Sequence, residues 1–264
     1  MPAGLRSTFR PPSDGLAWQR QLRDRHAHEG APPVPLTLST ARVEPIAKAF
    51  AAQVILKYEW LGTMVGSHHH YGIFFGPFCA GVRMAHRAYA VDRHAIGLLA
   101  RGACVHWAPT GTNSRLVAWT VRLLARDSGL KILLAYADSD AGEIGTIYQA
   151  CGWAYLGRGQ VSKQYVAPNS RIWNNRTFTG WCARVGVGLD TGRARLVAAG
   201  WRVERANAKH RYAVLVGRPD PALASRLESM KQPYPKRVGS AGSGTPGLQP
   251  GRGGATPTPT LAGA

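Results

Sequence analysis

Apolar residues recur along the chain in short blocks that alternate between helical and strand-like spacing. Residues 43–58 carry apolar side chains four positions apart, and this spacing predicts an amphipathic helix. Two apolar runs, Tyr71 to Phe78 and Gly81 to Met84, then predict a hairpin-like pair of strands around Cys79 and Ala80. The run from Ile96 to Trp107 predicts a central strand of the same sheet.

A helix, a buried strand and a short helix follow in tight succession. Residues 109–113 (PTGTN) form a turn, and Asn113 or Ser114 is suited to cap a helix that runs to Asp127. Residues 131–137 (KILLAYA) are apolar enough for a buried strand, after which the pattern predicts a helix over 146–151 and a strand over 153–156. This order predicts an α/β fold whose mixed central sheet is flanked by helices.

Three carboxylates stand directly after the buried strand, at Asp138, Asp140 and Glu143. Ligands of open α/β sheets bind at the carboxyl ends of strands, so this position suits chemistry. Tyr148, on the following short helix, is within reach of the same turn. A structural role is the alternative, because acidic residues after a strand also cap the next helix and stay solvated, and we favour it for Asp140.

After Gly157 the chain becomes strongly basic. Residues 158–237 hold 16 Lys and Arg against 4 Asp and Glu. The pattern there predicts a helix over 190–200, a hairpin of Trp201 to Glu204 with His210 to Val216, and a last helix over 221–230. We therefore expect a basic α+β C-terminal extension.

These patterns divide the chain into four parts. Residues 1–40, rich in Arg, Pro and Gly, are expected to form a flexible basic arm with room for one short helix around 16–24. Residues 41–158 form the predicted catalytic domain and 159–237 the basic extension. Residues 238–264 have almost no bulky apolar side chain, so they cannot offset the entropy lost on ordering and should be a disordered tail.

Net charge narrows the choice of partner. The 264 residues hold 33 Lys and Arg against 14 Asp and Glu, a formal charge of +19. Nucleic acid is the polyanion that such a chain best suits. An anionic membrane is disfavoured because the sequence shows no basic amphipathic helix, whereas a merely solvated excess of charge stays open.

The cysteines and the apolar runs bear on location. The four cysteines form no CxxC pair, so we interpret them as reduced thiols in the core. No apolar run approaches the roughly 18 residues that cross a bilayer, and the first residues are too polar for a signal peptide. We expect a cytoplasmic protein without a membrane partner.

No metal site is predicted. His68, His69 and His70 are interpreted as a polar loop, because three consecutive residues cannot all face one ion from a regular strand.

The turn before the predicted helix at 114–127 is a candidate anion site. Backbone N–H groups and the positive end of the helix dipole converge there. Its residues are Gly111, Thr112, Asn113, Ser114 and Arg115. An ordinary helix cap is the alternative.

Several ordered pieces of the sequence resemble known families. The helix and corner from Tyr148 to Trp153, Tyr-x-x-x-Gly-aromatic after a strand, resemble the acyl-CoA-binding half of GNAT acetyltransferases. More narrowly, Ala137-Asp138, GTIYQA at 145–150 and YLG at 155–157 resemble the Mom family of phage DNA modification proteins. Further pieces in matching order are YEWLG at 58–62, Ser114-Arg115, KHRYAVLV at 209–216 and PYPK at 233–236.

The resemblance implies a fold, a reaction and roles for residues. It implies a GNAT-like sheet, acetyl-CoA as the cofactor, and formation of N6-carbamoylmethyl (acetamido) adenine in double-stranded DNA, which protects phage DNA from host restriction. Asp138 and Tyr148 fall among the functional residues that it implies: the carboxylate would accept a proton from the attacking amine, and the phenol would reach the thioester sulfur or a developing oxyanion. In GNAT enzymes the turn equivalent to 109–115 holds the pyrophosphate of coenzyme A.

Two acidic residues depart from the family pattern. Glu143 stands where other members often have His, and Glu59 lies where they often show His-Tyr. Both are additional acid-base candidates, and neither supports a metal.

Basic and aromatic residues alternate in the extension, which suits phosphate contact combined with base stacking. The stacking candidates are Trp173, Phe178, Trp181 and Tyr212, and Trp60 offers either a stacking face or an aromatic lid on the core. The side chains expected to contact DNA phosphates are Arg171, Arg176, Arg193, Arg195, Arg202, Lys209 and Arg211. A solvated basic face is the alternative.

We therefore expect a DNA-modifying transferase that alkylates the N6 amine of adenine. Two other functions stay open: a GNAT-type N-acetyltransferase of a protein or small amine, and a nucleic-acid-binding protein without catalytic activity.

Overall fold

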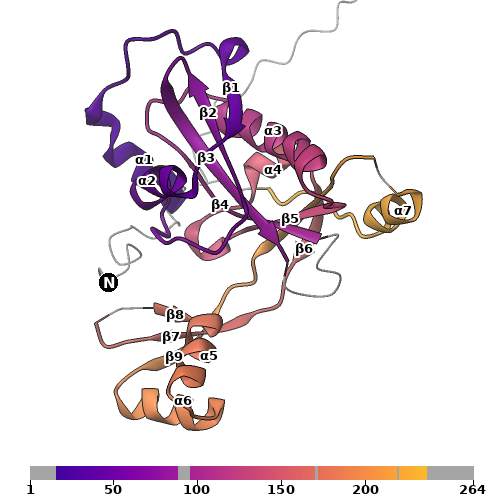
Figure 1. Cartoon of the computed structure of the whole chain (residues 1–264). Coiled ribbons are helices and arrows are strands. Elements are labelled where there is room, and N and C mark those ends of the chain that lie inside the picture. The colour runs from indigo at the N-terminus through magenta and orange to yellow at the C-terminus, as the bar shows by residue number, and fades with distance from the viewer. Residues whose placement is uncertain (1–15, 89–95, 170–171, 219, 237–264) are drawn as a thin grey trace, which may run out of the picture.

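The computed structural model describes residues 16–88, 96–169, 172–218 and 220–236. Its main sheet has seven strands, which in spatial order are β1 (Arg42–Pro45), β2 (His69–Phe75), β3 (Phe78–Arg87), β4 (Ile96–Cys104), β5 (Ile132–Ala137), β10 (His210–Leu215) and β6 (Ala154–Arg158). The helices around this sheet are α1 (Trp18–Arg25), α2 (Lys48–Tyr58), α3 (Thr112–Asp127) and α4 (Thr146–Ala150). Figure 1 shows α1 and α2 on one side of it and α3 and α4 on the other. The mixed α/β architecture predicted from the sequence is confirmed.

Strands β4 and β5 form the one parallel pair among the described strands of the main sheet. They pair only where Ile96 to Leu98 lie beside Ile132 to Leu134. Beyond Leu98, β4 continues to Cys104 and β5 to Ala137 without pairing to each other, so the two strands diverge. The opening lies at the carboxyl ends of both strands, where α/β proteins bind ligands.

A small lobe, residues 162–206, has its own sheet and core. Its strands run in the order β8 (Ile172–Asn174), β7 (Ser162–Val166) and β9 (Arg202–Ala206), and α5 (Asn175–Arg184) and α6 (Leu189–Ala198) cover them. Tyr165 stacks on Phe178 with 4.0 Å between ring centroids, and Cys182 and Leu196 complete the buried cluster. The small lobe is therefore a packed unit with a hydrophobic core.

The hairpin predicted from residues 201–204 and 210–216 is wrong. Strand β9 pairs with β7 in the small lobe, whereas β10 lies between β5 and β6 in the main sheet. The reason is burial: Tyr212 and Ala213 are both buried on β10, which suits a strand covered on both faces, whereas β9 exposes Arg202. Because α7 (Pro221–Ser229) also packs Leu227 against the main sheet, the extension expected from residue 159 returns to that sheet.

The flexible arm expected at residues 1–40 is wrong for its second half. The short helix expected around 16–24 is present as α1, and its Leu22 is buried in one cluster with Trp60 and Ala141. Arg23 donates hydrogen bonds to the backbone oxygens of His106, at 3.1 Å, and Ala108, at 2.6 Å. Residues 1–15 of the arm and the tail at 238–264 lie outside the described residues.

Three local boundaries differ from the prediction. Val43 pairs with Ile73 in β1, so the first helix begins only at Lys48, after Pro45. The turn between β2 and β3 lies at Gly76 and Pro77, because Gly76 adopts a φ of 54°. His69 and His70 begin β2 and are not part of a loop.

The predicted helices over 190–200 and 221–230 are present as α6 and α7, with slightly different ends. Within the described ranges, none of the helices combines the length and the apolar character that crossing a bilayer requires.

Candidate functional site

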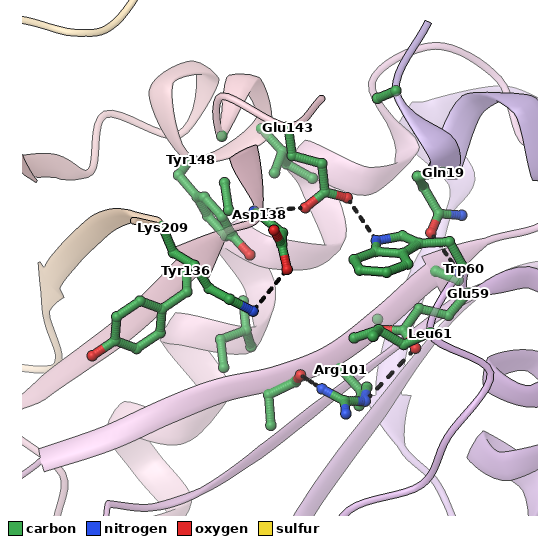
Figure 2. Close-up of a pocket in the computed structure, with 18 of the residues that line it drawn as sticks. Gln19, Glu59, Trp60, Leu61, Arg101, Tyr136, Asp138, Glu143, Tyr148 and Lys209 are labelled. Carbon is green, nitrogen blue, oxygen red and sulfur yellow. Dashed lines mark hydrogen bonds and ion pairs between the residues drawn. The ribbon is translucent and has the colours of Figure 1, made fainter. Parts of the chain in front are cut away.

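A cavity of about 1500 Å³ lies where β4 and β5 diverge. Its walls come from the end of α2, from β3 and β4, from the turns before α3 and after β5, from α4 and from the small lobe. All four candidate catalytic residues line it: Asp138, Tyr148, Glu143 and Glu59. Figure 2 shows their side chains converging from separate elements.

Asp138 follows the last residue of β5, and two contacts hold its side chain. Its side chain accepts a hydrogen bond from the backbone N–H of Asp140 at 3.1 Å, which starts a 3-10 turn. Lys209 Nζ lies 2.8 Å from Asp138 Oδ2, as Figure 2 shows. Asp138 is buried, so these two contacts fix the orientation of its carboxyl group in the cavity.

Glu143 folds back toward Asp138 because Gly142 takes a left-handed conformation, with a φ of 72°. One carboxyl oxygen accepts from the Trp60 indole at 3.1 Å and the other from the backbone N–H of Asp138 at 3.3 Å. Burial raises the pKa of Glu143. These contacts fix the carboxyl at the cavity wall.

Glu59 follows the last residue of α2 and is only 6% exposed. Arg101 Nε lies 3.6 Å from its Oε2, and this oxygen is buried without a hydrogen-bond partner among the described residues. Burial raises the pKa of Glu59 to about 8, against the opposing charge of Arg101. At neutral pH this carboxyl therefore keeps its proton and can donate it.

Tyr148 lies on α4, buried between the rings of Trp153 and Tyr212, whose centroids are 5.1 and 5.2 Å away. Burial raises the pKa of its hydroxyl, so the phenol is a proton donor at neutral pH. Gly145, with a φ of 75°, lets α4 start against Tyr212, because a Cβ there would lie 2.6 Å from Tyr212 Cζ. Tyr212 on β10 thus sets the position of α4.

Asp140 caps neither the 3-10 turn nor α4, because Asp138 and Gly145 hold those positions. It accepts hydrogen bonds from the side chain of Asn207 at 2.6 Å and from its backbone N–H at 3.3 Å. The acidic turn is thereby tied to the segment that joins the small lobe to β10.

The turn before α3 differs from the predicted cap. Gly111, with a φ of 89°, is the N-cap residue, and α3 starts at Thr112 without a side-chain cap hydrogen bond. Asn113 cannot cap because its side chain accepts from Arg83. Gly111, Thr112, Asn113 and Ser114 line the cavity, whereas Arg115 lies outside its lining. First-turn N–H groups of a helix lack intrahelical partners, so these residues fit a phosphate group.

The sequence profile of the Mom protein family matches residues 40–236. The chain belongs to the Mom protein family. The family resemblance inferred from Asp138, Tyr148 and their neighbours is thereby confirmed, whereas curated proteins give no match to the chain.

Solved structures similar to this Mom-family chain include acetyltransferases. Spermidine N-acetyltransferase from Vibrio cholerae, in complex with CoA and spermine, has 8% identity and a TM-score of 0.41 over 67% of this chain and 96% of its own. The ribosomal-protein-S18-alanine N-acetyltransferase from Escherichia coli has 9% identity and a TM-score of 0.41 over 69% and 97%. A GNAT-family acetyltransferase from Streptococcus pneumoniae has 11% identity and a TM-score of 0.40 over 67% and 99%.

The basic residues predicted to contact DNA fall into separate groups in this Mom-family fold. Arg176 and Lys209 line the cavity. Arg195 and Arg202 are exposed on the small lobe, and Arg193 is ion-paired with Asp190 there. Arg211 donates to the backbone oxygen of Leu156 at 2.7 Å within the main sheet. Arg171 lies outside the described residues.

The predicted base-stacking role is wrong for Phe178 and Tyr212, which lie in hydrophobic cores, whereas Trp60 lines the cavity. Trp60 is 3% exposed, packs edge-on against Trp18 and donates a hydrogen bond to Glu143, so both its stacking role and its role as a lid stay predictions. Phe178 is buried in the core of the small lobe and Tyr212 in the main sheet. Phe178 and Tyr212 alternate with arginines in the sequence because core positions alternate with surface positions there.

Three cavity residues of this Mom-family chain were not predicted. Gln19 accepts from the backbone N–H of Trp60 at 3.2 Å, Arg101 pairs with Glu59, and Arg83 is buried on β3. Arg83 left a signal in the sequence, because it is a charged residue inside the apolar run 78–85.

Proposed function

We propose that the protein is a transferase that moves a group from a coenzyme A-linked donor to the N6 amine of adenine in double-stranded DNA. One observation carries the proposal: carboxyl groups and a phenol share a cavity bordered by a helix N-terminus and by a basic lobe. The helix N-terminus suits the phosphates of the donor, and the basic lobe suits a nucleic-acid backbone.

The residues of the cavity fit such a donor. Gly111 to Ser114 would hold its pyrophosphate, and the divergence of β4 from β5 leaves space for its extended arm. When bound, the donor supplies an electrophilic carbon and a sulfur leaving group. Membership of the Mom protein family supports a carbamoylmethyl group as the one transferred, and the CoA in the Vibrio cholerae enzyme accords with the type of donor.

The candidate acid-base groups would accept and donate protons at different atoms of the reactants. The N6 amine of adenine is conjugated with the ring and weakly nucleophilic, so it must lose a proton as its new bond to carbon forms. Asp138, whose carboxyl lies beside Lys209, is placed to accept that proton. Tyr148 is placed to donate a proton to the departing sulfur, and Glu59, whose pKa burial raises to about 8, is placed to donate a further hydrogen bond. Glu143 lines the same cavity.

Adenine in a duplex must leave the base stack to reach these groups. The cavity of about 1500 Å³ has room for a flipped base beside the reactive end of the donor. The small lobe, with 8 Lys and Arg against 2 Asp and Glu in residues 162–206, would hold the flanking backbone through phosphate contacts. Arg176 belongs to both the lobe and the cavity wall.

The test is mass spectrometry of nucleosides from the DNA of bacteria that express the chain. We expect a heavier deoxyadenosine, whose exact mass distinguishes carbamoylmethyl from acetyl, and DNA that resists restriction enzymes. Asp138→Asn and Tyr148→Phe should abolish it. Asp190→Asn on α6, where the side chain is 96% exposed, is the matched control and should retain it.

Other outcomes identify other functions. Unmodified nucleosides together with newly acetylated proteins or polyamines would point to an amine acetyltransferase. Unmodified nucleosides with salt-sensitive DNA binding alone would point to a binding protein without catalysis. Either result refutes the proposed reaction.

A further inference from the structure

Tyr136 is an exposed aromatic residue in the wall of the cavity, and the proposed reaction gives it no role. It lies on β5, lines the cavity and is 44% exposed. Among the described residues its ring packs on no other aromatic ring, whereas Tyr148 in the same cavity lies between two rings. The ring of Tyr136 is therefore accessible to a ligand in the cavity.

Tyr136 shares one face of β5 with Asp138. Side chains alternate along a strand, and Leu133, Ala135 and Ala137 point into the main core on the opposite face. The backbone of Asp138 is still extended, with a φ of -90° and a ψ of 109°, so the alternation continues to this residue. The Cα atoms of residues two apart in a strand are separated by roughly 7 Å. A base that lies on the ring of Tyr136 can therefore extend its edge to the carboxyl of Asp138.

This face lies on the side of the main sheet opposite Tyr148. Directly paired residues of neighbouring strands share a face, and Tyr212 on β10 pairs with Ala135. Tyr148 packs on Tyr212, so α4 covers the face of Ala135. The donor, which the proposed function places at Tyr148 and the first turn of α3, would thus approach from the side of α3 and α4 in Figure 1. The side that bears Tyr136 is then left to the base.

The surroundings of Tyr136 suit a nucleotide. Lys209 Nζ lies 2.8 Å from Asp138 Oδ2, and Figure 2 shows Lys209 between the ring of Tyr136 and this carboxyl. Arg176 of the small lobe also lines the cavity, where its charge suits the phosphate beside a base. Toward the start of β5 the same face is covered by Leu227 of α7. The exposed ring is thus confined to the end of the strand where the cavity lies.

We propose that Tyr136 is the surface on which the adenine stacks once it has left the duplex, an inference that rests on the proposed action on DNA. An unpaired base is stabilised by stacking on an aromatic ring with an accessible face. Tyr136 offers such a face, whereas Phe178 and Tyr212 are buried. The adenine lies on the ring with its N6 edge toward Asp138.

Fluorescence anisotropy with two single strands tests this. Both strands are abasic backbones of the same length, and one of them carries a single central adenine, so that only the base differs. We expect the wild-type protein to bind the strand with the adenine at least about fivefold more tightly. Tyr136→Leu should remove this preference, whereas Tyr136→Phe should keep it because the ring remains. Phe78→Leu, at a 38% exposed ring outside the cavity lining, is the matched control and should keep it.

Two further measurements keep the inference testable if Tyr136→Leu does not fold, which circular dichroism would reveal. Tyr136→Trp enlarges the stacking surface and should increase the preference for the strand with the adenine. Tyr136→Gln removes the ring and keeps a long side chain. When 2-aminopurine replaces the adenine, its fluorescence should be quenched on binding to the wild type and less so on binding to Tyr136→Gln.

The outcomes separate the two proposals. Equal affinities of the wild type for the two strands, or a preference that survives the loss of the ring, would refute the stacking role of Tyr136 and leave the proposed function standing. No binding of either strand or of duplex DNA to the wild type would refute both.

Discussion

Glu59 should make the free energy of unfolding fall as the pH rises through neutrality. Burial raises its pKa from the ordinary value of 4.5 to about 8 in the folded protein, whereas unfolding exposes it to water. Between these two values the folded protein holds one proton more at this site than the unfolded chain does. Raising the pH therefore favours the unfolded state, and this effect is complete above the folded pKa.

The substitution Glu59→Gln removes this linkage and keeps the size of the side chain. One pKa unit corresponds to about 1.4 kcal/mol. The stability of Glu59→Gln relative to the wild type should thus increase by roughly 2 to 3 kcal/mol between about pH 5.5 and 7.5.

Urea unfolding followed by tryptophan fluorescence at about pH 5.5, 6.5 and 7.5 measures this difference. Glu44→Gln on β1, where the side chain is 45% exposed, controls for the loss of an exposed carboxyl. A difference for Glu59→Gln that stays constant across this range would mean that the buried carboxyl titrates at its ordinary pKa. It would then be ionised at neutral pH, and its assignment as a hydrogen-bond donor would be refuted.

Three further predictions concern the scaffold and the partner. Phe178→Ala should remove the ring stacked on Tyr165 and lower the free energy of unfolding by about 3–5 kcal/mol in urea titrations, and a loss below about 1 kcal/mol would contradict a packed small lobe. Gly145→Ala should lower the melting temperature in calorimetry, because its φ of 75° and the nearby Tyr212 both oppose a side chain; an unchanged value would show that α4 can shift. Charge reversal at Arg195 and Arg202 should weaken binding to all duplex sequences alike and flatten the salt dependence in fluorescence anisotropy, and unchanged affinity would place the DNA surface elsewhere.

The part of the site between residues 138 and 148 could be predicted because its residues are close together in the sequence. Asp138, Glu143 and Tyr148 lie within a strand, a glycine-broken turn and a short helix, and each of these elements has a clear pattern of its own. Glu59 was proposed from the family resemblance, but its burial and its neighbour Arg101 come from folding. Trp60 and Glu143, 83 positions apart, meet only because the main sheet brings α2 to the acidic turn.

The sheet order could not be predicted from turn signals. The segment at 206–208 has the composition of a hairpin turn, and a local pattern does not state which strand a neighbour pairs with. The choice was decided by burial: Tyr212 packs against Tyr148 and Tyr155 in the main sheet, at 5.2 Å between centroids in both cases. The same limit applies to the position of the Arg83 side chain, which depends on the glycine opposite it on β4.

The position of β10 has a consequence for how the protein matures on the ribosome. Residues 210–215 complete the main sheet and seat α4, and they emerge only after the whole small lobe has been synthesised. The ribosome therefore completes the small lobe before the nascent chain can close the main sheet around the cavity. A product that ends prematurely within the small lobe would lack β10 and an intact small lobe, so we expect it to be inactive.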